Sequence, residues 1–142
     1  MANSDVLPGL PGKAAEEEVT MNNNGLSTQA VEFIITRDLD ELAHLTETGI
    51  SQVLGANQAV LRRLFKTSQS ISLERFILRE KLHRAAFILE REPGISVKKL
   101  SERLGFPEVE HFSKAFEDYL AITPGRYKEL RFKNKNHNDA SF

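Results

Sequence analysis

The sequence of 142 residues contains no cysteine. Disulfide bonds, a thiol nucleophile and a cysteine-ligated zinc site are therefore excluded, and the composition fits a reducing compartment. Its longest apolar runs, such as Phe33-Ile34-Ile35, are far shorter than the roughly 20 residues that span a bilayer. The first residues also lack the basic and apolar regions of a signal peptide, so we expect a cytoplasmic protein without a membrane segment.

The motifs of enzymes are missing as well. There is no glycine-rich phosphate loop, and no nucleophile stands beside a base in a recognisable motif. The histidines lack the spacing of metal ligands; they are His44, His83, His111 and His137. We therefore expect no enzymatic activity, no cofactor and no metal site.

Charge is distributed unevenly along the chain, although the net charge is only -1. Residues 1–45 carry two basic and eight acidic side chains, whereas residues 46–133 carry sixteen basic and eleven acidic ones. The first segment thus has a net charge of -6 and the second a net charge of +5. A basic body behind an acidic leader is compatible with a nucleic-acid partner.

The two ends of the chain differ in composition from its middle. Residues 1–26 combine Pro-Gly pairs, three consecutive glutamates and three consecutive asparagines, which predicts a disordered acidic leader. Ser27 or Thr28 can then cap a first helix whose apolar stripe runs to Leu42 and which ends before Thr46. Residues 134–142 are polar and are expected to form a flexible tail.

An internal repeat is the most informative feature of the sequence. Residues 50–55 (ISQVLG) match residues 100–105 (LSERLG) at an offset of fifty. Past the glycines the offset becomes fifty-one, and residues 61–66 (LRRLFK) match residues 112–117 (FSKAFE). The chain therefore contains two copies of one small unit.

Each copy has the start and stop residues of a helix, a glycine turn and a second helix, over about 46–68 and about 96–120. In the first copy Gly55 permits the left-handed turn and Asn57 caps the next helix. In the second copy Ser96 caps the first helix, Gly105 allows the turn between the helices, and Pro107 suits the first turn of the second helix. The side chains expected to face inward are Leu45, Ile50, Val53, Leu54, Leu61, Leu64 and Phe65, then Val97, Leu100, Leu104, Phe112, Ala115 and Phe116.

Two further helices complete the expected architecture. A connector helix over about 72–91 joins the copies and stops at Pro93-Gly94, and a last helix over about 123–132 starts with Thr123 as its cap. Twenty residues at ~1.5 Å each give about 30 Å, close to one turn of B-DNA. We predict an all-α fold of about seven helices, with two helix-turn-helix subdomains joined by a long connector within residues 27–133.

Residues 46–132 resemble the DNA-binding domain of the AraC/XylS family of bacterial transcription regulators, and within it the stand-alone MarA type. The resemblance lies in the two helix-turn-helix copies at this spacing. It is strongest in the second copy, in residues 95–97 (ISV), 104–106 (LGF), 112–116 (FSKAF) and 122–127 (ITPGRY). It covers 87 of the 142 residues.

The resemblance implies sequence-specific transcription regulation by a monomer on double-stranded DNA, with RNA polymerase as a further partner. One recognition helix of each copy would enter a major groove, in two successive grooves. The base-contact candidates carried over are Ala59, Arg62, Arg63, Val109, Glu110, His111 and Lys114. Asn57, Lys66 and Ser113 are the phosphate-contact candidates, because phosphate contacts fix register while base contacts specify sequence. Arg79 and Arg126 are expected to be structural.

The second recognition helix departs from the family pattern. Glu117 and Asp118 follow Phe116, where the family usually has lysine or arginine. Carboxylates near phosphates forfeit the counterion release that supplies much of DNA affinity. Two alternatives therefore stay open: a protein-interaction module with this fold and weak DNA binding, or the output fragment of a longer effector-controlled regulator.

Overall fold

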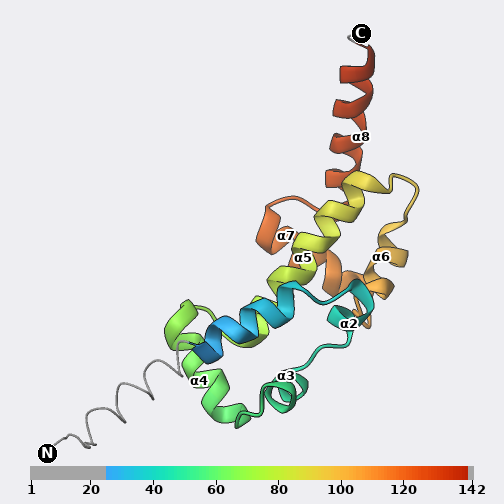
Figure 1. Ribbon diagram of the computed structural model, residues 1–142. Coiled ribbons are helices and arrows are strands. Elements are labelled where there is room, and N and C mark those ends of the chain that lie inside the picture. Colours follow the sequence, from blue (N-terminus) through green and yellow to red (C-terminus); the bar gives the residue numbers. More distant parts are fainter. Residues whose placement is uncertain (1–24, 141–142) are drawn as a thin grey trace, which may run out of the picture. The chain divides into compact units, whose positions relative to one another are not determined.

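The computed structural model describes residues 25–140, with side chains described for residues 25–132 (Figure 1). Every regular element in this range is a helix, which confirms the all-α class. Residues 25–35 are helical, and seven further helices follow. They are α2 (Leu39–Ala43), α3 (Glu47–Leu54), α4 (Gln58–Gln69), α5 (Leu73–Arg91), α6 (Val97–Arg103), α7 (Val109–Leu120) and α8 (Pro124–Ala140).

The chain divides into two compact units. Unit 1 contains residues 25–35 and Thr46–Glu74 of the described chain, and unit 2 contains Thr36–Leu45 and the residues from Arg75 onward. Each unit therefore holds one copy of the repeat: α3 and α4 in unit 1, α6 and α7 in unit 2. The connector α5 begins in unit 1 and continues into unit 2, close to the predicted boundaries.

The predicted first helix is wrong in both its start and its length. Gly25 and Leu26, placed in the leader by their composition, are already helical, and the rest of the predicted leader lies outside the described residues. Ser27 is not a cap but a buried helical residue whose hydroxyl donates to the carbonyl of Leu64 at 3.3 Å. The helix ends at residue 35 because Asp38 starts α2 with a reciprocal capping box to Glu41.

The turn chemistry of unit 1 is as the sequence predicts. Gly55 ends α3 in the left-handed conformation with φ of 66°, and the Asn57 side chain accepts from the Val60 amide at 3.2 Å. Val53, however, is 63% exposed instead of facing inward. The inward face of α3 is centred on Ile50, Ser51 and Leu54, and Val53 lies about 110° from that centre.

Unit 2 repeats the same turn. Ser96 caps α6, and Gly105 has φ of 81°. The amide of Phe106 donates to the carbonyl of Ser101 at 3.1 Å, just as the amide of Ala56 donates to the carbonyl of Ser51 at 2.9 Å. The prediction for Pro107 is wrong by two positions, because α7 starts at Val109 and Pro107 precedes its N-cap.

Aromatic side chains form much of the core of unit 2. Phe112 and Phe116 are fully buried, and their ring centroids lie 5.8 Å apart. The ring of Tyr127 on α8 packs edge-on against Phe116 at 5.6 Å. Thr123 caps α8 as predicted, but the helix continues to Ala140, past the predicted end at 132, since no glycine or proline follows Gly125 in it.

A comparison of Gly55→Ala with Gly105→Ala tests the glycine turns. Both glycines need a left-handed backbone, which costs an alanine roughly 1–2 kcal/mol. A Cβ at Gly55 meets open space, whereas one at Gly105 collides with the backbone of Ala43. We therefore expect Gly105→Ala to lower the free energy of unfolding by about 1–3 kcal/mol more than Gly55→Ala does, as measured by urea unfolding followed by circular dichroism. Equal losses of unfolding free energy in the two variants would show that the backbone at Ala43 can shift at little cost to accommodate the new Cβ.

Candidate nucleic-acid interface

The outward face of α4 is basic. Leu61 and Phe65 are fully buried, which turns Arg62, Arg63 and Lys66 outward, where all three are exposed. Helix α4 contains no acidic residue, so this face carries three positive charges. Ala59, on the same face, is also exposed. We call this set of four side chains the α4 face.

Arg62 is held by an ion pair within unit 1. Its Nε and Nη2 both donate to one oxygen of Glu47, Oε1, at 3.0 Å and 2.8 Å. The side chain of Glu47 is 14% exposed and that of Arg62 is 56% exposed, so the carboxylate is covered while the guanidinium reaches solvent. A second polar contact joins the same two helices, because the Thr48 hydroxyl donates to the Gln58 side-chain oxygen at 2.9 Å.

The other cations of the α4 face are not held in this way. Neither Arg63 nor Lys66 forms an ion pair with any residue from 25 to 132. Asn57, at the start of the helix, uses its side-chain oxygen for the cap and keeps its amide nitrogen as an outward donor. Two long cations and one amide donor are thus available to an anionic ligand.

The outward face of α7 has the opposite charge. Glu110, Glu117 and Asp118 are exposed, as is Glu108 at the N-cap, while Lys114 is its single lysine. Lys114 itself lies 3.7 Å from a carboxylate oxygen of Asp118. Glu117 and Asp118 also stand in the last turn, where negative charge opposes the helix dipole. Both carboxylates of this acidic pair therefore face solvent.

The remaining candidates on α7 occupy mixed environments. His111 is exposed, with its ring nitrogen Nε2 3.7 Å from a carboxylate oxygen of Glu108. Val109 and Ser113 are only half-buried, so they can reach a ligand through part of their surface. The structure therefore gathers the predicted site residues into two sets, one on α4 in unit 1 and one on α7 in unit 2.

Glu47 is the residue of this interface that sequence reasoning missed. It lies fifteen positions before Arg62, on the other side of the glycine turn. Helical periodicity connects residues three or four apart and says nothing about a contact of this span. The only signal in the sequence is an acidic residue in the first turn of a helix, which is common for reasons of the helix dipole alone.

Several charged groups of unit 2 contact other residues of the same unit. Arg126 pairs with Glu129 at 2.7 Å, while the guanidinium of Arg79 lies 5.9 Å from the ring centroid of Tyr119. The Lys81 ammonium donates to the carbonyl of Ala43, and burial lowers the pKa of Lys81. Burial raises the pKa of Tyr127, and its hydrogen bond to Glu90 raises it further.

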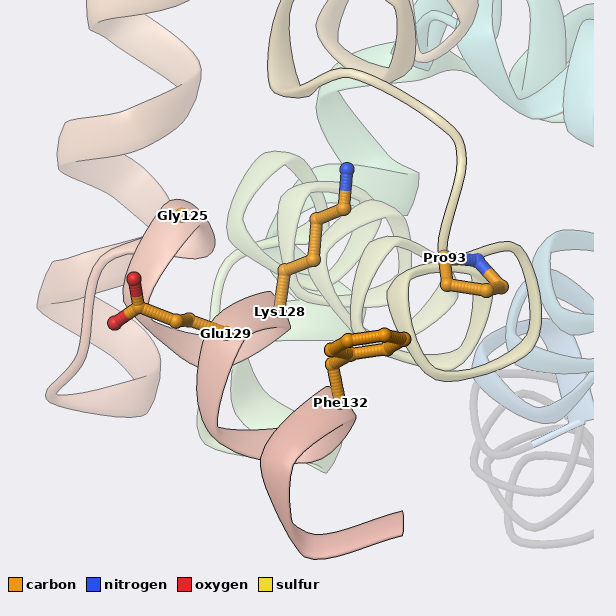
Figure 2. Close-up of a pocket in the computed structure, with 5 residues that line it drawn as sticks. All are labelled: Pro93, Gly125, Lys128, Glu129 and Phe132. Carbon is orange, nitrogen blue, oxygen red and sulfur yellow. The ribbon is translucent and has the colours of Figure 1, made fainter. Parts of the chain in front are cut away.

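Unit 2 also has a cavity of about 280 Å³ (Figure 2). Its lining consists of Pro93 together with Gly125, Lys128, Glu129 and Phe132 of α8, so it shares no residue with either candidate face. Among the residues that the structure describes, no cluster of three or more histidine, aspartate or glutamate side chains could hold a metal ion. No helix in that range is long and apolar enough to cross a membrane.

The curated relatives are regulators of transcription. The Msm operon regulatory protein of Streptococcus mutans is 29% identical over 80 residues, which are 56% of this chain and 28% of that protein. The HTH-type transcriptional regulator MtrA of Neisseria gonorrhoeae is 32% identical over 73 residues, which are 51% of this chain and 24% of that protein. The match thus spans about a quarter of the length of each of these relatives.

Solved structures share the fold at low sequence identity. An AraC-type DNA-binding domain protein from Chromobacterium violaceum superposes with a TM-score of 0.68 at 23% identity, covering 78% of this chain and 96% of that one. The C-terminal domain of AraT, a response regulator from Geobacillus stearothermophilus, superposes with a TM-score of 0.65 at 21% identity, covering 74% of this chain and 84% of that one.

A family model described as a helix-turn-helix domain matches residues 50–130, which contain the second copy of the repeat and all but the start of the first. This match covers more than half of the chain, and the solved structures agree with it in fold. The chain therefore belongs to the helix-turn-helix family of AraC-type DNA-binding domains found in transcription regulators.

Proposed function

We propose that this chain is the DNA-binding part of a transcription regulator and that it recognises duplex DNA chiefly through α4. The observation that carries the proposal is the α4 face, which exposes three cations and no carboxylate on a helix that follows a glycine turn. A helix in this position of a helix-turn-helix fits the major groove. Cations on it supply affinity by releasing the counterions of the phosphates.

The side chains of the α4 face divide by chemistry. The guanidinium groups of Arg62 and Arg63 can each donate two hydrogen bonds to the O6 and N7 atoms of guanine, so they are proposed base contacts. Ala59 can offer only an apolar contact, for example to a thymine methyl group. Asn57 and Lys66 are proposed phosphate contacts, which fix the register of the helix without reading sequence.

Unit 2 is proposed to contribute less. Val109, Glu110, His111 and Lys114 remain its base-contact candidates, and Ser113 its phosphate contact. Glutamate can accept a hydrogen bond from the cytosine amine, but three further carboxylates on or beside α7 repel the phosphates. The acidic surface specifically favours the second candidate function, in which unit 2 binds a protein partner while unit 1 binds DNA.

The wider setting of the domain is also part of this proposal. The two recognition helices carry opposite charge, so an asymmetric site suits a monomer better than a twofold pair of identical half-sites. Two successive major grooves remain part of the proposal, because each copy of the repeat contributes one recognition helix, α4 in unit 1 and α7 in unit 2. We further propose RNA polymerase as a partner and the cytoplasm as the location.

The salt dependence of DNA binding tests the proposal as a whole. If the α4 face and its neighbours neutralise phosphates, the logarithm of affinity falls linearly with the logarithm of salt concentration. We expect a slope equivalent to about four to six phosphate contacts, measured by fluorescence anisotropy on a labelled duplex. A slope near zero, or no binding in low salt, would rule out DNA as the ligand.

Arg63→Ala separates base reading from phosphate contact. If Arg63 reads guanine, its removal costs about 1–3 kcal/mol and relaxes the preference at one base pair. The measurement is binding to a panel of duplexes with single base-pair changes in a site selected from random DNA. Arg126→Ala, which removes an exposed cation of α8, serves as the control and should leave the preference unchanged. An equal loss on every duplex would assign Arg63 to a phosphate.

The double variant Glu117→Lys with Asp118→Lys tests whether α7 docks on DNA. If it docks, affinity rises for all sequences and the salt slope steepens by about one or two phosphates' worth. The control, Glu74→Lys with Glu102→Lys, makes the same change of charge at exposed positions on α5 and α6. If α7 does not dock, both variants change binding only slightly, and the difference vanishes above about 0.15 M salt, where the Debye length is about 8 Å.

A further inference from the structure

The ion pair of Arg62 leaves a defined part of its guanidinium open. A guanidinium has five N–H donors, on Nε, Nη1 and Nη2. Glu47 Oε1 accepts from Nε and Nη2, which form one edge of the group. The other edge, formed by Nη1 and Nη2, still has donors that point away from the carboxylate. This is the edge that a guanidinium can present to two acceptors in one plane.

Glu47 is itself held in place. Its side chain is 14% exposed, and it stands in the first turn of α3, where the helix dipole favours a carboxylate. Thr46 caps this helix through the amide of Gly49 at 3.0 Å, and Thr48 bonds Gln58 at the start of α4. The carboxylate is therefore a fixed support, while the 56% exposed Arg62 is the part that faces solvent.

We infer that Glu47 is a positioning residue for sequence recognition, which holds the Nη1 and Nη2 edge of Arg62 ready to bind guanine. This inference rests on the proposed function of α4 as a reader of DNA. A free arginine loses rotational entropy when it forms a bidentate contact, whereas a held one has already lost it. The carboxylate also offsets the charge of Arg62, so that its contribution shifts from attraction to any phosphate toward discrimination between bases.

Arg62 and Arg63 are thereby distinguished, although they are neighbours on one helix. Arg62 is oriented and partly neutralised, which suits hydrogen bonding to a base. Arg63 forms no ion pair with the described residues, so its charge is available to DNA in full. The sequence, in which the two arginines are adjacent, gives no reason to separate them.

The test compares Glu47→Ala, Glu47→Gln and Arg62→Ala on the duplex panel already described. Arg62→Ala should reduce discrimination at one base pair by about 5- to 100-fold. Glu47→Ala should reduce discrimination at the same base pair by about 3- to 10-fold, because a free Arg62 can still form the contact after losing entropy. Its affinity for unrelated DNA should rise, and the salt slope should steepen by about one phosphate. Glu47→Gln keeps an acceptor and should retain more discrimination than Glu47→Ala.

Base preference is the decisive readout because a structural defect does not change it. If Glu47→Ala only unfolded part of the protein, affinity would fall by the same factor on every duplex. Glu74→Ala is the control for charge, since Glu74 is an exposed carboxylate of the same unit. It should raise non-specific affinity slightly and leave the preference at every base pair intact.

The outcomes separate the two claims. If the wild-type protein selects a sequence but Glu47→Ala leaves the preference at the Arg62 base pair unchanged, the positioning role is wrong and the proposed function stands. The same conclusion follows if Arg62→Ala reduces the discrimination between bases at no position of the site. If the wild-type protein selects no sequence from random DNA, the proposed function fails, and the role of Glu47 fails with it.

Discussion

Burial of one pair of apolar side chains on each recognition helix is the constraint on which the rest of the site depends. On α4 the pair is Leu61 and Phe65, and on α7 it is Phe112 and Phe116, all of them fully buried. Each such side chain contributes roughly 1.5–3 kcal/mol when it leaves water. Because residues four apart lie on one side of a helix, the buried pair fixes which residues point outward. The charge of the interface follows from that orientation.

The two units have the same packing pattern and turn geometry but opposite surface charge on their recognition helices. A glycine in the left-handed conformation follows both first helices, at the C-cap of α3 and one residue past the C-cap of α6, with the same hydrogen bond from the residue after the glycine. Both recognition helices end at a non-glycine residue with positive φ, Ser70 in unit 1 and Ala121 in unit 2. On this common scaffold α4 carries only positive charges, whereas α7 carries mostly negative ones. The same packing and turn geometry are thus compatible with opposite surface charges.

Much of the fold and the orientation of the site were predictable, because both depend on local rules. The caps at Asn57 and Ser96 and the turn at Gly55 follow from residue type and spacing. Predictions failed where two local rules competed. The stripe from residue 31 to Leu42 continues in sequence, but the capping box of Asp38 divides it into two helices. Val53 is three residues from the buried Ile50, which is a helical spacing, but it lies about 110° from the centre of the buried face of α3 and is therefore exposed.

The sequence by itself determined the all-helical class, the two repeated motifs and the outward direction of Arg62, Arg63 and Lys66, since these follow from periodicity and turn chemistry within a few residues. Only the tertiary structure decided that residues 36–45 belong with unit 2 and that Glu47 holds Arg62. Both facts depend on contacts between residues far apart in the chain. Local sequence fixes how each helix turns, but which distant carboxylate meets a given arginine is set by how the helices pack together.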